Sequence, residues 1–229
     1  MLHKTKAIVL NHIKYGETSI IVNMYTEAFG IQSYIENGVR KAKARNKIAL
    51  FQPLTLLDLV VYKKSNASLN RISEIKCNQP YQQIPYEIIK STIGIFLAEV
   101  LSSILREEEE SNPRLFSFLE SSLISFDQQQ SAYQNFHLSL LLQLSSYLGF
   151  YPSGAEEVLE ELRPFQTFRL DALQEKKFNQ LLTEDNGGEL KLTGEERSLF
   201  LKIILNFYQL HSHSIKEVKS LKVLREVLH

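Results

Sequence analysis

The sequence predicts an α+β chain in which a small five-stranded barrel precedes an all-helical domain. Five short runs rich in β-branched and aromatic residues fill the first 80 of its 229 residues, with turns rather than long helices between them. From residue 81 onward, the apolar residues recur at helical spacing. The formal charge also changes sign: residues 1–80 carry twelve Lys and Arg against five Asp and Glu, and residues 81–229 carry fourteen against twenty-one. We therefore expect two domains, 1–80 and 81–229, the first of which faces an anion.

The predicted strands are the runs 6–10, 19–25, 31–35, 54–62 and 69–75. Gly and Asn residues, such as Asn37 and Gly38 after the third run, mark the turns between them. Five short strands of this kind fit the OB-fold, a barrel that binds oligonucleotides on a face flanked by the loops after strands 1 and 4. We expect these two loops at residues 11–18 and 63–70.

The two predicted loops supply candidate nucleic-acid-binding side chains. Lys14 and Tyr15 fall in the first loop, and Lys63 and Lys64 fall in the second. Tyr15, and Tyr34 in the third run, offer rings on which bases can stack, a contact worth about 1–3 kcal/mol per base. For each tyrosine, a ring in the core or at the rim of the barrel is an equally good interpretation.

A basic segment, residues 40–47, lies between the third and fourth predicted strands. It carries five cations and no acid: Arg40, Lys41, Lys43, Arg45 and Lys47. Lys and Arg separated by Ala cannot pack a core, so we expect a solvated, mobile loop. A charge run alone is most simply a surface loop. Beside an oligonucleotide-binding barrel, however, it is suited to contact phosphates without reading bases.

The helical domain is predicted from the period of its apolar residues. We expect helices at 85–104, 113–126, 136–148, 156–162, 193–210 and 215–228, with weak periodicity over 165–192. Thr193 and Glu196 have the spacing of a capping box, which starts the fifth of these helices. The helix at 136–148 is apolar nearly all round, so we place it at the centre of the domain.

The last predicted helix carries a candidate surface for a protein partner. Its cations recur every three residues, interleaved with apolar residues: Lys216, Lys219, Lys222 and Arg225. Residues spaced by three lie side by side on a helix, so two or three of these cations can flank one groove. The simpler interpretation is a row of solvated lysines at the edge of a core helix.

The sequence lacks the motifs of common enzyme classes. It has no G-x-x-x-x-G-K-[ST] phosphate-binding loop, no G-x-S-x-G and no H-E-x-x-H. The single cysteine, Cys77, excludes a disulfide framework and a multi-cysteine zinc site, and we expect it to be a small buried apolar group. His211 and His213 are spaced by two, which separates their rings on a helix. The acidic clusters at 107–110 and 156–161 are typical of solvated helix faces.

The N-terminus indicates a cytoplasmic protein. It lacks the apolar core of a signal peptide, and no apolar run in the chain approaches 18 residues. We therefore expect no membrane segment.

Several short patterns follow one another in the order found in a known family. The chain reads Lys-Ala-Ile-Val-Leu, Tyr-Gly-Glu-x-Ser, Tyr-Thr-Glu-x-x-Gly, Asn-Gly-Val-Arg and Phe-Gln-Pro-Leu within its first 54 residues. Leu-Gly-Phe-x-Pro follows at 148–152, and Lys-Ser-Leu-Lys-Val-Leu at 219–224. This ordered set resembles the bacterial DNA repair protein RecO over nearly the whole chain.

The resemblance implies an N-terminal OB-fold, a C-terminal helical domain and a recombination mediator that is not an enzyme. Such a mediator binds single- and double-stranded DNA and anneals complementary strands, in the cytoplasm and associated with the nucleoid. With its partner RecR, it helps to load RecA onto DNA covered by single-strand-binding protein. It must also meet the acidic C-terminal tail of that protein, for which we single out Lys216, Lys219 and Lys222.

One departure from the family concerns zinc. Many relatives carry a four-cysteine zinc module after the Leu-Gly-Phe-x-Pro pattern, but residues 153–192 contain no cysteine here. We therefore expect a variant of the family without zinc and without any other cofactor.

Two functions of other classes stay open. One is an OB-fold adaptor that binds another protein or a structured RNA, its basic segment contacting acidic groups. The other is a metal-dependent nuclease that uses the acidic clusters.

Overall fold

A computed structural model describes residues 1–40, 45–63, 69–77, 79–108, 110–183, 190–212, 215 and 217–228, with the backbone alone at 45, 46 and 107. The chain forms two compact units. The first contains Met1–Gln82 and Gly94–Leu123, and the second contains Gln83–Ile93 and Ile124–His229. Helices α2 (Ile88–Ile104) and α3 (Pro113–Gln128) therefore each contribute to both units. The division into domains 1–80 and 81–229 stays a prediction.

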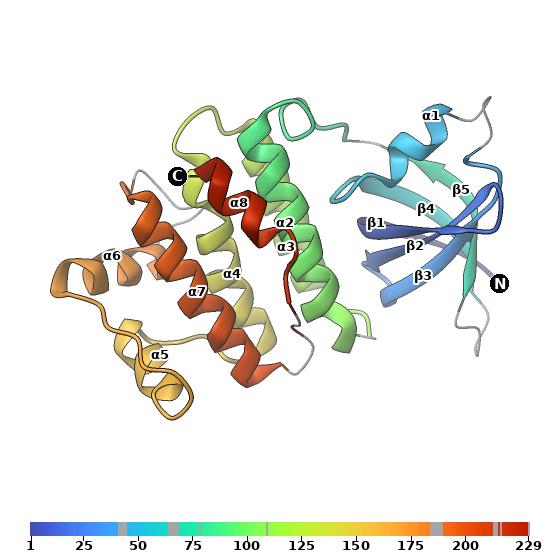
Figure 1. The fold of residues 1–229 in the computed structure, drawn as a ribbon. Coiled ribbons are helices and arrows are strands. Elements are labelled where there is room, and N and C mark those ends of the chain that lie inside the picture. The colour runs from blue at the N-terminus through green and yellow to red at the C-terminus, as the bar shows by residue number, and fades with distance from the viewer. Residues whose placement is uncertain are drawn as a thin grey trace. The chain divides into compact units, whose positions relative to one another are not determined.

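The first unit contains a closed five-stranded barrel, as predicted (Figure 1). Around the barrel the strands follow the order β1-β2-β3-β5-β4, and β3 pairs with β5 in parallel while the other four pairs are antiparallel. Their bounds are β1 Leu2–Tyr15, β2 Ser19–Thr26, β3 Gly30–Glu36, β4 Leu56–Tyr62 and β5 Asn70–Lys76. The predicted barrel and helical remainder are thus confirmed.

Strand β1 is longer than predicted, and the prediction of a loop at 11–18 is wrong. The register shifts between Val9 and Asn11, after which β1 stays paired with β2 until Tyr15 lies opposite Ser19. An extra residue of this kind is a β-bulge, which bends a strand without ending it. The connection between β1 and β2 is therefore only residues 16–18, with Gly16 in the left-handed region at a φ of +57°.

The apolar run at the start of β1 is buried on both faces of the strand. Ala7 and Val9 belong to the core inside the barrel. Ile8 is also fully buried, although it points to the opposite face. Residues 94–123 of the first unit pack on that outer face: the ring of Tyr25 stacks on Phe116, with centroids 6.1 Å apart. Burial on two faces explains why this run is continuously apolar rather than alternating.

A short helix, α1 (Arg45–Ile48), begins within the basic segment and continues into the 3-10 turn η2 (Ala49–Phe51). The basic segment is therefore not a loop throughout, because residues 45–47 are helical. Phe51 explains the position of this helix: its ring is fully buried in the barrel core and anchors the end of the helical stretch. Lys41 and Lys43 lie outside the described residues.

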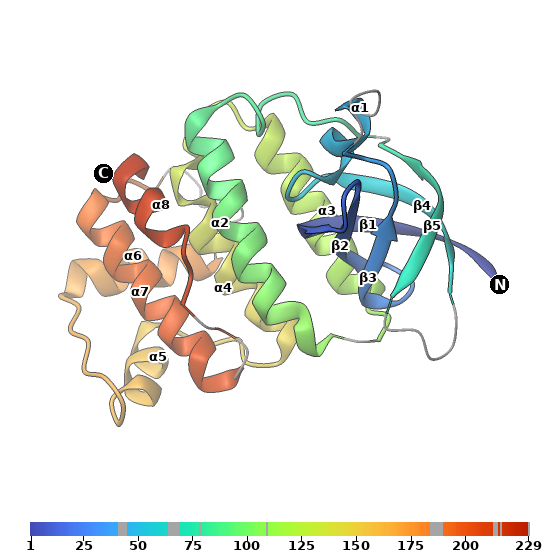
Figure 2. The same ribbon diagram turned by 45° about the vertical axis from the view of Figure 1, so that its right-hand side comes forward.

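The second unit is helical, and α4 lies at its centre, as predicted (Figure 2). Helix α4 packs against α6 and α7, and α7 also packs against α5 and α8. The capping box at the start of α7 is confirmed, with the Thr193 hydroxyl accepting from Glu196 N and the Glu196 carboxylate accepting from Thr193 N. The bounds are α4 Phe136–Leu148, α5 Ala155–Leu162, α6 Ala172–Thr183, α7 Gly194–His211 and α8 Leu221–Leu228. Further 3-10 turns are η3 Leu105–Glu107, in the first unit, and η4 Tyr133–Asn135.

Two helices of this unit differ from the prediction. Helix α6 lies within the stretch of weak periodicity because few of its side chains are buried, among them Phe178, Leu181 and Leu182. The last helix begins at Leu221 rather than at residue 215. Ile215 is not helical, and its side chain is buried.

Candidate nucleic-acid interface

Hydrogen bonds of Arg40 join the chain that follows β3 to the turn between β1 and β2. Its backbone N donates to Thr18 O at 3.0 Å, and its Nη1 donates to Gly16 O at 3.1 Å. Since β1 ends in Lys14 and Tyr15, both exposed, these side chains and Arg40 lie at the same end of the barrel. The structure thus brings together three of the predicted contact residues.

Lys47, on α1, has a partner within the barrel. Its Nζ pairs with Glu36 Oε1 at 2.5 Å, and the Lys47 side chain stays 40% exposed while that of Glu36 is 10% exposed. A cation that already faces a carboxylate adds less positive potential than an unpaired one, so Lys47 is a weaker phosphate contact than its position suggests.

An apolar row leads across the outer surface at this end of the barrel. Ile13 of β1 pairs with Ile21 of β2, Ile21 pairs with Ile35 of β3, and Ile35 pairs with Arg71 of β5. Ile13 is 57% exposed, Tyr15 two residues along β1 is 50% exposed, and Arg71 is exposed. The sequence prediction missed this row because it ended the first strand at residue 10. The alternation of polar and apolar residues at 12–15 was the available signal.

Further along the same face of β1, β2 and β3, polar contacts cover the surface. Asn11, Asn23 and Ser33 form a ladder across β1, β2 and β3, in which Asn23 Nδ2 donates to Asn11 Oδ1 and Ser33 Oγ donates to Asn23 Oδ1. Asn11 Nδ2 donates in turn to Ser102 Oγ of α2 at 2.6 Å. On β1, β2 and β3, the open part of this face is therefore the end that carries Ile13 and Tyr15.

The hypothesis that Tyr34 stacks on bases is wrong. Tyr34 pairs with Val22 on the inner face of the sheet and is 1% exposed. Burial raises the pKa of its hydroxyl far above the ordinary value. The ring is part of the barrel core, which was the other interpretation of this residue.

Lys63 lies near the start of β1, whereas Lys14, Tyr15 and Arg40 lie near its end. It follows Tyr62, which pairs with Leu2 at the beginning of β1, whereas Lys14 and Tyr15 end that strand. The Lys63 ammonium sits 4.0 Å from the centroid of the Phe29 ring. The structure therefore does not group Lys63 with Arg40. Lys64 lies outside the described residues.

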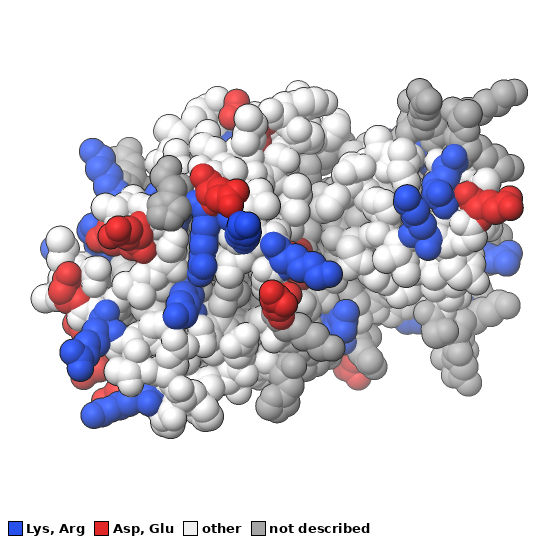
Figure 3. All heavy atoms as spheres, viewed as in Figure 1, with Lys and Arg blue, Asp and Glu red and all other residues white. Residues whose placement is uncertain are grey.

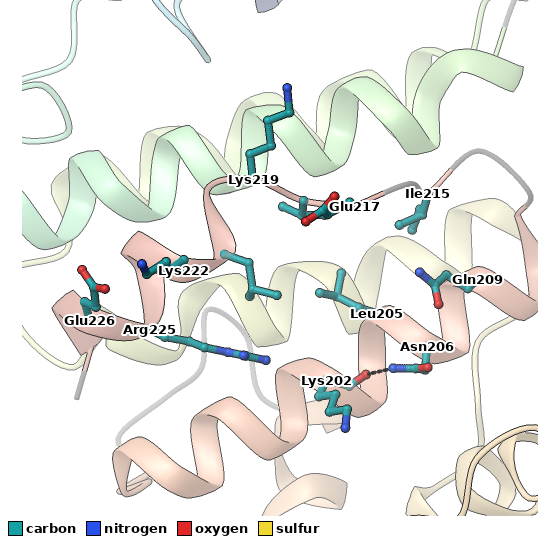
Figure 4. Close-up of a pocket in the computed structure, with 12 residues that line it drawn as sticks. Lys202, Leu205, Asn206, Gln209, Ile215, Glu217, Lys219, Lys222, Arg225 and Glu226 are labelled. Carbon is teal, nitrogen blue, oxygen red and sulfur yellow. Dashed lines mark hydrogen bonds between the residues drawn. The ribbon is translucent and has the colours of Figure 1, made fainter.

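A groove of about 810 Å³ opens on the helical unit between α7 and the chain that leads into α8 (Figure 4). Its apolar floor includes Leu205, Ile215 and Leu221. Basic side chains line it together with two acids, Glu217 and Glu226. The cations are Lys202, Lys219, Lys222 and Arg225. On the face drawn in Figure 3, Lys and Arg atoms gather over α7 and α8, with acidic atoms among them.

Arg225 reaches from α8 toward α7 and points its guanidinium at the side of the groove where Lys202 lies (Figure 4). Its Nε is buried and has no hydrogen-bond partner among the described residues. An unsatisfied buried donor of a cation favours an anionic acceptor. Lys216, the first of the predicted partner-binding lysines, lies outside the described residues.

Two carboxylates of the acidic cluster at 156–161 have structural partners. Glu157 accepts hydrogen bonds from Ser153 N and Ser153 Oγ, which lower the pKa of its carboxyl, and Glu161 pairs with His211. Within the described part of the chain, no group of three or more His, Cys, Asp or Glu is placed to hold a metal ion. In the same part, no helix combines the length and apolar character needed to cross a membrane. His213 lies outside it.

Comparison with known proteins gives one consistent result. The family model for the Recombination protein O N terminal matches residues 1–81, and the model for the Recombination protein O C terminal matches residues 85–221. The chain belongs to the RecO family. It is 40% identical to the DNA repair protein RecO of Flavobacterium psychrophilum over 98% of both chains. It is 36% identical to that of Bacteroides fragilis over 99% of both.

Membership of the RecO family makes the chain a DNA repair protein with an N-terminal OB-fold barrel. It also confirms the resemblance found in the ordered sequence patterns. Some of these patterns shape the candidate interface directly: Tyr-Gly-Glu-x-Ser forms the β1–β2 turn, and Asn-Gly-Val-Arg ends in Arg40, which holds that turn.

Proposed function

We propose that this chain is a non-enzymatic mediator of DNA repair and homologous recombination that binds single- and double-stranded DNA and anneals complementary strands. With RecR, it helps to load RecA onto DNA covered by single-strand-binding protein, in the cytoplasm and at the nucleoid. The proposal rests on one observation: in this member of the RecO family, Lys14, Tyr15 and Arg40 lie together at one end of the barrel.

Annealing requires a surface that neutralises two strands without reading their bases, so that the strands can sample register. Cations at the end of the barrel contact phosphates, which carry no sequence information. Tyr15 offers an exposed ring for stacking, which every base accepts. Lys63, which follows the residue paired with the start of β1, is suited to the second strand because it lies away from the first contact, and we propose Lys64, its neighbour in the sequence, as a further contact. The basic segment adds Lys41, Lys43, Arg45 and Lys47.

We further propose that the groove between α7 and α8 receives the acidic C-terminal tail of single-strand-binding protein. The apolar floor suits an apolar terminal side chain, and the cations around it suit the acidic residues and the terminal carboxylate. Lys216, Lys219 and Lys222 are the proposed contacts, and Arg225 supplies the unsatisfied Nε. Such a surface would give residues 81–229, which carry an excess of acids, a local site that attracts an acidic peptide.

A strand-annealing assay in EDTA tests the function. The chain should convert complementary oligonucleotides to duplex faster than they anneal alone, without metal and without shortening either strand. An adaptor for protein or structured RNA would not accelerate annealing. A nuclease would degrade the DNA once Mg²⁺ was restored. Either result would contradict the proposal.

A further inference from the structure

The turn between α5 and α6, residues 163–171, presents an aromatic ring between two arginines. Phe165 is 76% exposed, and Arg163 and Arg169 are exposed on either side of it. Among the described residues, neither guanidinium takes part in a hydrogen bond or an ion pair. One exposed apolar side chain needs no explanation by itself. A ring between two arginines whose guanidiniums have no hydrogen-bond or ion-pair partner among the described residues does need an explanation.

The turn is held in place by its own backbone. Phe165 N and Gln166 N both donate to Leu162 O at 2.9 Å, and Arg163 N donates to Leu159 O at 3.0 Å. Pro164 fixes one backbone dihedral directly before the ring. The backbone that carries the ring is thus fixed, which lowers the entropy that a ligand contact must overcome.

The end of the turn is fastened as well. The Asp171 carboxylate accepts hydrogen bonds from Leu173 N and Gln174 N at 2.9 Å and so caps α6. Asp171 is also the first acid after Glu161, which pairs with His211. The negative charges at the two ends of the turn therefore already have partners within the fold.

A third cation stands beside the turn. Lys202 of α7 places its Nζ 5.6 Å from the centroid of the Phe168 ring, and it also lines the groove. Alternating rings and cations match a single strand of nucleic acid, in which bases and phosphates alternate. An acidic protein segment would explain the cations but not the exposed ring between them.

We infer that this turn is a second contact for single-stranded nucleic acid, in which Phe165 stacks on a base and Arg163 and Arg169 contact the neighbouring phosphates. The inference rests on the proposed function and extends it to the helical unit. Duplex DNA should not use the ring, because its bases are stacked inside the helix. The turn therefore distinguishes single strands from duplexes, a distinction that phosphate contacts alone do not make.

The test uses the full chain, which contains no tryptophan. Phe165→Trp, Tyr15→Trp and Tyr86→Trp each introduce a single fluorophore, at the turn, at the barrel and at a control site that is 80% exposed. Titration with oligo(dT) should quench Phe165→Trp and leave Tyr86→Trp unchanged, and a duplex should not quench Phe165→Trp. Phe165→Ala should lower oligo(dT) affinity roughly tenfold with an unchanged salt dependence.

The experiment can disprove the turn contact and the barrel interface independently of each other. Quenching of Tyr15→Trp but not of Phe165→Trp would overturn the turn contact and leave the barrel interface standing. Quenching of Phe165→Trp alone would support the turn and count against the barrel. Equal quenching of Phe165→Trp by a duplex would overturn base stacking. An unchanged oligo(dT) affinity in Phe165→Ala would also overturn the inference, leaving the turn to a protein partner.

Discussion

The ammonium of Lys90 is enclosed in the helical unit, where it closes the end of α3. Its Nζ donates to Phe126 O, Asp127 O and Gln129 O, and to Gln83 Oε1. The last carbonyls of a helix have no partner within the helix, so a cation placed there satisfies them and favours the helix dipole. Burial lowers the pKa of Lys90, while the charges of Asp127 and Glu87 act in the opposite direction.

Lys90→Met should therefore destabilise the chain strongly. The methionine keeps most of the side-chain volume but leaves several buried carbonyls without a donor, at a cost of about 2–5 kcal/mol. Urea unfolding measures the loss, and Lys176→Met, at an exposed site on α6, is the matched control. A loss in Lys90→Met no larger than in the control would show that the carbonyls find other donors.

His137, on α4, makes the stability of the fold depend on pH. Burial lowers the pKa of its ring to about 3, and the Arg197 guanidinium acts in the same direction. In the unfolded chain the ring takes up a proton below about pH 6.5, whereas the folded chain keeps it neutral. The contribution of His137 to the free energy of unfolding therefore keeps its full value above about pH 6.5. It decreases as the pH falls toward 3, because the unfolded state then binds a proton that the folded state does not.

Replacing His137 should remove this dependence. Between pH 6.5 and 4.5 the native chain should lose roughly 2–3 kcal/mol more unfolding free energy than His137→Gln, whose amide does not titrate. Urea unfolding of both proteins across this range provides the measurement. Parallel curves would mean that the ring takes up its proton without unfolding.

At the scale of elements, the hairpin of α5 and α6 lies within residues 153–192, the segment in which the family resemblance led us to look for a zinc module. Apolar side chains such as Val158 and Phe178 are buried in it. Two polar contacts fasten its ends: Asn179 Oδ1 accepts from Ala155 N at 2.7 Å, and the Tyr151 hydroxyl donates to Leu182 O at 2.6 Å. These contacts join α5 and the residues before it to α6 through groups of the protein itself.

We expect the hairpin to be independent of zinc and dependent on Asn179. Elemental analysis should find no stoichiometric zinc, and EDTA should leave the melting temperature unchanged. Asn179→Ala should cost about 1–2 kcal/mol, because Ala155 N loses its acceptor, and should speed amide exchange in α5. Lys176→Ala on the same helix is the control. One zinc per chain would contradict the prediction.

The groove between α7 and α8 gives a second prediction at this scale. Lys219→Glu and Lys222→Glu each reverse a charge in its lining and should weaken binding of an acidic tail peptide several-fold, since each replaces an attraction by a repulsion. Annealing of naked DNA should be unaffected. A peptide titration followed by anisotropy measures the change, with Lys176→Glu as control. Unchanged affinity in both variants would place the tail elsewhere.

For the whole molecule, the sequence predicted which elements form better than it predicted which side of each element is buried. The barrel, the central helix α4 and the capping box at Thr193 each follow from a local pattern that the structure keeps. Tyr15 and Tyr34 both stand in alternating runs, yet one is exposed and the other buried. Register decides between them, and it depends on pairing with β2, which the local sequence does not contain.

The same limit applies to the candidate interface. The charges of the basic segment were visible in the sequence, but the Lys47–Glu36 pair and the hydrogen bond from Arg40 to Gly16 were not, because they join residues distant along the chain. The long β1 was missed since a bulge interrupts its period. Helix α6 was missed because it buries only a small part of its surface.

DNA binding should be steep in salt if the barrel end is the interface. Removing one cation that binds a phosphate of a single strand flattens the slope of log K against log salt by about 0.7, so replacing the five cations of the basic segment by Ala should flatten it by up to ~3. The structure refines this expectation. Lys47 faces Glu36, so Lys47→Ala should change the slope less than Lys14→Ala, whose side chain is exposed at the end of β1.

Fluorescence anisotropy with labelled oligo(dT) between low and moderate salt measures these slopes. The control removes the same charge from other exposed positions, namely Arg106, Arg114, Lys76, Lys176 and Lys191. If net charge alone governed binding, the slope would flatten equally in both fivefold variants. If the interface is localised, the slope flattens only in the variant of the basic segment. If the control matches the variant of the basic segment, binding is spread over the surface, and the barrel end does not have its assigned role.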